Sequence, residues 1–111
     1  MHKHVEVVAS LKNGKETLEA LRLFKPDLAI VDIKMPELSG LEVLNEIRKE
    51  NNSTKFIILT LYTSDYYRQL AIQAGADYFF NKADDFEKVS TVVSGMIRET
   101  KKKIEKKVVN L

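Results

Sequence analysis

Three polar side chains stand at the ends of apolar segments, and their types together suit phosphoryl chemistry. The three are Asp32 in the run Leu28–Ile33, Thr60 in the run Phe56–Leu61 and Lys82 after Tyr78–Phe80. A carboxylate can be the nucleophile that receives a phosphoryl group. An ammonium neutralises phosphate oxygens, and a hydroxyl donates a hydrogen bond to one of them. A lone threonine or lysine in such a place is usually a solvated strand end, but all three on successive strands predict a site.

The elements that must position these side chains follow a regular order. Strands are predicted at His4–Ser10, Leu28–Ile33, Phe56–Leu61 and Tyr78–Phe80, each followed by a helical pattern. The second and third runs are apolar on both faces, which is typical of central parallel strands covered by helices on each side. Strands and helices that alternate at this spacing predict an α/β domain with right-handed crossovers. Sites in such sheets form at the carboxyl ends of the strands, where the three side chains would converge.

Short-range signals mark where the helices begin and end. Ser39 and Glu42 have the spacing of a capping box. Pro26 ends the first helix, because the residue before a proline disfavours the α region. Gly75 stands where a glycine commonly closes a helix. The pair Asp84–Asp85 precedes the last helix, where carboxylates complement the helix dipole. These signals support the predicted alternation of strands and helices.

Composition limits the class of protein. The 111 residues are 44% hydrophobic and 31% charged, the proportions of one ordinary globular domain. No cysteine is present, so disulfides and thiol catalysis are excluded. The longest apolar run is far shorter than the ~20 residues of a transmembrane helix. The amino terminus has no pattern of a secretory signal, and we expect a cytoplasmic protein without membrane contact. The net charge of +2 gives no reason to expect a nucleic-acid partner.

Several segments share the pattern of one known family. They are Asp32-Ile33-Lys34-Met35-Pro36 with Ser39-Gly40-Leu41, Ile57-Ile58-Leu59-Thr60, and Ala74-Gly75-Ala76-Asp77-Tyr78-Phe79-Phe80-Asn81-Lys82. They resemble, in turn, the phosphorylation segment, the switch strand and the stretch before the lysine of bacterial response-regulator receiver domains. The likeness runs from about Val5 to Ile97 and is most similar to stand-alone, chemotaxis-regulator-like receivers. It implies a flavodoxin-like parallel sheet with helices on both faces.

The resemblance implies a role for each site residue. Asp32 would be the phosphoacceptor, Thr60 the switch hydroxyl, and Lys82 the residue that holds a phosphate oxygen. The backbone carbonyl of Lys34 would join Asp32 as a ligand of Mg²⁺, the cofactor of the family. Phe79 matches the switch aromatic of the family, although a buried strand phenylalanine explains it equally well.

The chain departs from the family pattern at the first strand and first helix. Its strand at Val5 matches the second strand of the family, so the amino-terminal βα unit and the acidic pair that it carries are missing. The Mg²⁺ site is therefore predicted to be incomplete, because this ion usually takes one or two carboxylates besides its waters. The sheet order 2-1-3-4-5 puts the missing strand in the middle. We expect a four-stranded sheet or a strand-exchanged dimer, since an unpaired apolar edge binds another chain.

The chain divides into a truncated receiver domain over 1–100 and a basic tail over 101–111. Three arrangements of the tail are open. We favour a solvated helical extension. The second is a dimerisation helix through Ile104, Val108 and Leu111, which makes a homodimer a candidate assembly. The third, which we least expect, is a strand at Val108–Leu111 that folds back to fill the gap. The five lysines of the tail have no interleaved aromatics, so a nucleic-acid surface is not predicted.

The resemblance implies a function in two-component (phosphorelay) signal transduction. A sensor histidine kinase or phosphotransfer protein would phosphorylate Asp32, and the domain would act on a downstream protein target without a DNA-binding domain of its own. It would not be an enzyme beyond self-catalysed phosphorylation and dephosphorylation. The alternative is a phosphorylation-incompetent truncated receiver that acts as an interaction or dimerisation module. A hydrolase built on Asp32 would need a general acid or base nearby, and both histidines lie at the amino terminus.

Overall fold

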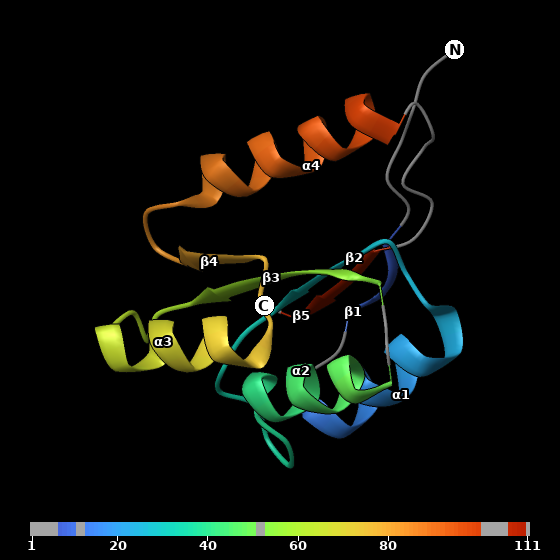
Figure 1. Cartoon of the computed structure of the whole chain (residues 1–111), viewed down its shortest axis with the longest axis vertical. Coiled ribbons are helices and arrows are strands. Elements are labelled where there is room, and N and C mark those ends of the chain that lie inside the picture. The colour runs from blue at the N-terminus through green and yellow to red at the C-terminus, as the bar shows by residue number, and fades with distance from the viewer. Residues whose placement is uncertain (1–6, 11–12, 51–52, 101–106, 111) are drawn as a thin grey trace.

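The protein is an α/β sandwich with one parallel sheet between helices on its two faces (Figure 1). The computed structural model describes residues 7–10, 13–50, 53–100 and 107–110. Its strands are β1 (Val7–Ser10), β2 (Leu28–Val31), β3 (Lys55–Thr60), β4 (Tyr78–Asn81) and β5 (Lys107–Asn110). Its helices are α1 (Gly14–Phe24), α2 (Gly40–Lys49), α3 (Asp65–Ala74) and α4 (Phe86–Thr100). The predicted α/β alternation is confirmed, and the first three residues of the predicted strand His4–Ser10 lie outside the described ranges.

The last strand in the chain lies inside the sheet. The strand order is β1-β5-β2-β3-β4, and all neighbours are parallel. Val31 of β2 stands opposite Asn110 of β5 on one side and Ile58 of β3 on the other. The expectation of a four-stranded sheet is therefore wrong, because the described part of one chain forms five strands, whereas the alternative of a strand-exchanged dimer stays a prediction. The segment Lys107–Asn110 fills the position that the missing first strand would take.

The tail thus takes the arrangement that the sequence made least expected. A helical extension is wrong for Lys107–Asn110, whereas residues 101–106 and 111 lie outside the described ranges. A helix there would leave the backbone groups of β1 and β2 unpaired on the sides that now face each other across β5, and unpaired strand edges are costly. The β-branched pair Val108–Val109 also favours a strand. Backbone hydrogen bonding of Lys107–Asn110 to β1 and β2 therefore outweighed the helical spacing of apolar residues in the tail.

The placement of β5 between β1 and β2 keeps the usual handedness of the crossover connections. The connections from β1 to β2, β3 and β4 all advance in one direction across the sheet, and α1, α2 and α3 lie on the same face (Figure 1). The connection from β4 to β5 runs back in the opposite direction, and α4 lies on the opposite face (Figure 1). Reversing both the direction and the face preserves the hand of a crossover. All four connections therefore share the single hand that parallel strands require.

The core consists of two apolar layers, one on each face of the sheet. Alternate residues of β2 and β3 point to opposite faces, as the strand geometry demands. On the face of α1–α3 the buried set includes Leu21, Ala29, Val31, Val43, Leu44, Phe56 and Ile58. On the face of α4 it comprises Leu28, Ile30, Ile57, Leu59 and Val89. The two-sided apolar runs read from the sequence are explained by this arrangement. Among the described residues, no helix is both long and apolar enough to cross a membrane.

The helix boundaries follow the signals in the sequence. The Ser39 hydroxyl accepts from the Glu42 N–H and the Glu42 carboxylate accepts from the Ser39 N–H, both at 3.1 Å, which completes the predicted capping box of α2. Gly75 closes α3 with a φ of 104°, in the left-handed region that favours glycine. Asn13 caps α1 by accepting from the Glu16 N–H at 2.8 Å. These caps set the loops that follow β1 and β2 and so prepare the edge where the site lies.

Candidate functional site: a carboxylate–lysine pair at the carboxyl edge of the sheet

Asp32 is the first residue after β2, and its backbone is held tightly from one side. The Gly40 N–H at the start of α2 donates to the Ile33 carbonyl at 2.8 Å. A Cβ built on Gly40 would overlap the carbonyl oxygen of Asp32, so only a glycine lets α2 approach this closely. The side chain of Asp32 is 15% exposed. The fold thus fixes the backbone of this residue and leaves a narrow opening to its carboxylate.

Lys82 meets Asp32 across fifty residues of chain. The Lys82 Nζ lies 3.0 Å from the Asp32 Oδ2, at hydrogen-bonding distance, and the lysine side chain is 31% exposed. The Lys82 N–H donates to the Thr60 carbonyl at 2.9 Å, which anchors the start of the loop after β4 to the end of β3. The convergence predicted from the strand ends is therefore confirmed for the carboxylate and the ammonium. They form a single ion pair at the carboxyl edge of the sheet.

Thr60 lies on the strand between them and is fully buried. Its hydroxyl accepts a hydrogen bond from the Tyr62 N–H at 3.1 Å. Among the described residues, hydrogen bonding therefore joins Asp32 to Lys82, while the Thr60 hydroxyl bonds the loop that follows its own strand. The three side chains share one edge of three adjacent strands, as predicted, but only two of them are in direct contact.

Of the two other residues singled out from the sequence, Lys34 follows β2 at this edge and Phe79 lies within β4, opposite Ile58 of β3. The Lys34 N–H donates to the Asp32 Oδ1 at 3.4 Å, a long bond that orients the loop around the carboxylate. Phe79 on β4 is 7% exposed and packs into the apolar layer on the face of α1–α3. The guanidinium of Arg68 on α3 lies 4.7 Å from the centroid of the Phe79 ring, a cation–π contact that covers it.

The loop from β4 to α4 is closed by its own acidic residues. The Asn81 side-chain oxygen accepts from the Ala83 N–H at 2.8 Å, and the Asn81 N–H donates to the Asp85 carboxylate at 2.8 Å. The Asn81 side-chain amide also donates to the Asp84 carboxylate at 3.3 Å. The carboxylates of Asp84 and Asp85 are thus both engaged within the loop.

The electrostatics of Asp85 agree with this structural use. The hydrogen bond from the Asn81 N–H lowers the pKa of the Asp85 carboxyl, and Lys88, whose ammonium lies 3.3 Å away, lowers it further. Hydrogen bonds to a carboxylate favour its charged form. The charged Asp85 carboxylate therefore stabilises the loop through its hydrogen bond with Asn81.

A divalent cation fits the described residues only in part. Asp32 can offer one carboxylate and Lys34 a backbone carbonyl, whereas Mg²⁺ calls for near-octahedral oxygen coordination with one or two carboxylates. Among the described residues there is no cluster of three or more His, Cys, Asp or Glu side chains that could hold a metal ion. The incomplete Mg²⁺ site stays a prediction from the sequence.

One feature of the edge was missed from the sequence, namely a group of tyrosines beside the carboxylate. The rings of Tyr62 and Tyr67 are 5.8 Å apart, and those of Tyr66 and Tyr67 are 5.4 Å apart, in edge-to-face arrangements. The Lys34 ammonium lies 5.2 Å from the centroid of the Tyr62 ring. Three tyrosines within seven residues after Thr60 were the available signal.

Comparison with known proteins assigns the chain to a family. The family model "Response regulator receiver domain" matches residues 1–94. The transcriptional regulatory protein YvfU of Bacillus subtilis is 31% identical over 98 residues, which are 88% of this chain and 49% of that protein. The DNA-binding transcriptional activator EvgA of Escherichia coli K12 is 27% identical over 89 residues, 80% of this chain and 44% of that protein.

Solved structures agree. A DNA-binding response regulator of the LuxR family from Staphylococcus aureus superposes with a TM-score of 0.76 at 31% identity, covering 81% of this chain and 75% of that one. The receiver domain of AraT, a response regulator from Geobacillus stearothermophilus, gives a TM-score of 0.74 at 29% identity, covering 86% and 74%. The fold is that of a flavodoxin-like receiver domain. The chain belongs to the response-regulator receiver family, and it spans about half the length of the curated relatives that it matches.

Proposed function

We propose that this receiver domain accepts a phosphoryl group on Asp32 and passes the signal on by protein–protein contact. One observation carries the proposal: the Lys82 ammonium lies 3.0 Å from the Asp32 carboxylate at the carboxyl edge of the sheet. A partly buried carboxylate can act as a nucleophile, and the ammonium beside it can bind the oxygens of the phosphoryl group that the carboxylate receives. The membership of the chain in the receiver family supports the same role.

Phosphoryl transfer to Asp32 exchanges one bond to phosphorus for another. A carboxylate oxygen of Asp32 forms a bond to phosphorus, and the bond from phosphorus to the donor atom breaks with its electron pair staying on the donor. The donor would be a phosphorylated histidine of a sensor kinase or of a phosphotransfer protein. Lys82 would then move its hydrogen bond from the carboxylate to a phosphoryl oxygen. The carboxylate and the ammonium need no proton transfer in this step.

The proposal gives Thr60 and Phe79 the roles of a switch. A phosphoryl group on Asp32 is an acceptor that the Thr60 hydroxyl can donate to, in place of its present bond with the Tyr62 N–H. Phe79 lies on the strand next to Thr60, and its ring is covered by Arg68. A shift of the hydroxyl would make room for the ring to follow. The exposed side chains that would carry the change to a downstream protein are Tyr66, Ile72, Tyr78 and Phe86.

The proposal keeps Mg²⁺ as the expected cofactor, with Asp32 and the Lys34 carbonyl as its ligands. The ion would supply positive charge beside the phosphoryl oxygens. The described residues add no second carboxylate to these two ligands, because Asp84 and Asp85 are engaged with Asn81. We place the action of the domain in the cytoplasm, where the donor kinases of two-component pathways expose their phosphohistidines.

The small number of carboxylates that the described residues offer to a metal favours a second candidate function. A chain whose described part offers one carboxylate to the metal could be a receiver shell that binds partners without being phosphorylated. Such a module would use the same exposed side chains but would not respond to a phosphodonor. The two functions differ in one measurable event, the formation of an acyl phosphate on Asp32.

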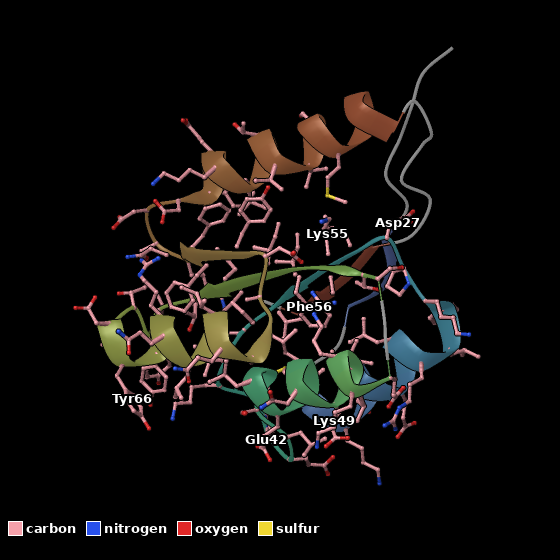
Figure 2. All side chains as sticks on the ribbon, in the orientation of Figure 1. Asp27, Glu42, Lys49, Lys55, Phe56 and Tyr66 are labelled. Carbon is pink, nitrogen blue, oxygen red and sulfur yellow. The ribbon has the colours of Figure 1, made fainter. Side chains whose placement is uncertain are left out.

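Mass spectrometry after incubation with a small phosphodonor, with and without Mg²⁺, tests the proposal. We expect the mass of one phosphoryl group to be added to the unmutated chain and none to Asp32→Asn. Asp27→Asn is the matched control, since this exposed aspartate lies near the opposite edge of the sheet (Figure 2). Phosphorylation of Asp27→Asn should equal that of the unmutated chain. An unmutated chain that gains no phosphoryl group under either condition would establish the phosphorylation-independent module instead.

A further inference from the structure

A lysine and three tyrosines form a cluster beside the carboxylate that the proposed phosphoryl transfer does not use. The Lys34 ammonium lies 5.2 Å from the centroid of the Tyr62 ring and 5.7 Å from that of Tyr67. Tyr66 packs edge-on against Tyr67 and is 68% exposed, and it projects from α3 at the end of the sheet where the strands finish (Figure 2). We call Lys34, Tyr62, Tyr66 and Tyr67 the tyrosine cluster.

The backbone ties this cluster to the site at two points. Lys34 follows Asp32 by two residues, and its N–H donates to the Asp32 carboxylate at 3.4 Å. Tyr62 follows Thr60 by two residues, and its N–H donates to the Thr60 hydroxyl at 3.1 Å. The side chains of these two residues then meet above the edge of the sheet. A change at either Asp32 or Thr60 therefore reaches the same cation–π contact.

The Lys34 ammonium, two residues along the chain from Asp32, is not committed to a carboxylate in the described part of the chain. Lys82 already pairs with Asp32, whereas no carboxylate among the described residues forms an ion pair with Lys34. Its side chain is exposed and has a flexible stem of four carbons, which lets the ammonium swing between positions. A phosphoryl group carries nearly two negative charges, more than one ammonium can neutralise.

We propose that the Lys34 ammonium is a second phosphoryl-binding cation, held on the Tyr62 and Tyr67 rings in the resting protein and transferred to the phosphoryl oxygens during phosphorylation. This inference rests on the proposed function of Asp32. The direction of transfer follows from the strengths of the two contacts. A charge-assisted hydrogen bond to a phosphate oxygen is stronger than an exposed cation–π contact. The tyrosine rings thus store the cation close to the site without neutralising it.

Two substitutions should change the rate of phosphorylation in opposite directions. Lys34→Met removes the cation, and we expect phosphorylation by a small phosphodonor to be about tenfold slower, the loss of one charge-assisted hydrogen bond. Tyr62→Leu removes a ring that holds the cation back but keeps the backbone bond to Thr60, and we expect phosphorylation about two- to fivefold faster. Lys49→Met is the control for lost charge, because this exposed lysine is the last residue of α2 (Figure 2), whereas Asp32 contacts Gly40 at the start of that helix. Its rate should equal that of the unmutated chain.

Equal rates for Lys34→Met and the unmutated chain would overturn the inference while leaving Asp32 as the phosphoacceptor. A slower Tyr62→Leu would overturn the storage of the cation on the rings. Both substitutions are at exposed positions, and urea unfolding should confirm that the variants fold.

A binding measurement that needs no phosphorylation separates this inference from the proposed function. Ring currents of Tyr62 and Tyr67 should displace the NMR signals of the Lys34 side-chain methylenes. In Asp32→Asn, which cannot form the acyl phosphate, titration with inorganic phosphate should move these signals back toward those of a free lysine. Movement here supports the second cation even if the unmutated chain is never phosphorylated. Signals that stay in place during the titration would overturn the inference, whatever the phosphorylation assay shows.

Discussion

The two edges of the sheet each hold a carboxylate against a cation at nearly the same distance, with opposite consequences. At the amino edge the Arg48 guanidinium lies 3.1 Å from the Asp77 carboxylate. Arg48 also donates to the Gly75 carbonyl at 3.0 and 3.1 Å and to the Thr54 carbonyl at 2.9 Å. Asp77 accepts from the Phe56 N–H at 2.8 Å. This pair is one part of a network that joins α2, β3 and the loop before β4.

At the carboxyl edge the Asp32 carboxylate has fewer and weaker bonds. Among the described residues it accepts from the Lys82 ammonium at 3.0 Å and, by one long bond, from the Lys34 N–H at 3.4 Å. The comparison shows how to tell a structural ion pair from a reactive one. A carboxylate that accepts from a backbone N–H at 2.8 Å and from an arginine anchored on two carbonyls is held in place, whereas one with a long backbone bond beside a movable lysine is available for chemistry.

The largest expected effect comes from removing the cation at the carboxyl edge. Lys82→Met should slow phosphorylation of Asp32 about a hundredfold, because it removes a donor aimed at the developing phosphoryl charge. The free energy of unfolding should change by less than about 1 kcal/mol, since the pair is partly solvated. Rates with a small phosphodonor and urea unfolding measure the two effects. Lys55→Met, which removes a lysine 3.9 Å from Asp77 at the other edge, should leave the rate unchanged.

The next effect in size comes from the arginine at the amino edge. Arg48→Ala should lower the free energy of unfolding by about 2 kcal/mol, because it leaves a carboxylate and two carbonyls without their charged donor. Arg22→Ala is the matched control, since its pair with Glu50 is 48% and 41% exposed. Exposed pairs are worth at most about 1 kcal/mol, and this one should cost less than Arg48. Equal losses in urea unfolding would contradict the structural role assigned to the amino edge.

The smallest effect concerns Asp85, whose carboxylate stabilises the loop after β4. The pKa of Asp85 is lowered in the folded protein, chiefly by the Asn81 N–H, from an ordinary value of 3.8. The group therefore stabilises the fold at pH values above about 3.8 and loses this contribution as the pH falls through its lowered pKa. Comparing urea unfolding of the unmutated chain and Asp85→Asn from about pH 6 to about pH 3 isolates this group. The stability advantage of the unmutated chain should shrink toward acid, and an advantage that grows would contradict the assignment.

Much of the fold was readable from the sequence because the signals are local or periodic. The two-sided apolar runs of β2 and β3, the capping box at Ser39 and the closing Gly75 each specify an element within a few residues. The convergence of Asp32 and Lys82 followed from the rule that parallel strands end at one edge. These inferences need no knowledge of distant contacts beyond the strand order.

The position of β5 could not be read in the same way. The segment Lys107–Asn110 has few residues and lies among lysines, so its local pattern favours a helix as much as a strand. What decides its state is the gap between β1 and β2, a feature formed by segments about eighty and a hundred residues earlier in the chain. The cation–π contact of Lys34 with Tyr62 was missed for the same reason, since it depends on two loops that meet only in the folded protein.

One measurement tests the central claim most directly, namely that the carboxyl edge responds to a phosphoryl group while the amino edge stays fixed. Backbone amide NMR shifts are recorded before and after adding Mg²⁺ with a phosphodonor or beryllofluoride. We predict large shifts at Thr60, Tyr62 and Lys82 and small ones at Phe56 and Asp77, with no response in Asp32→Asn. Unchanged signals at Thr60 and Lys82 in the unmutated chain, or equal shifts at Asp77, would contradict the account.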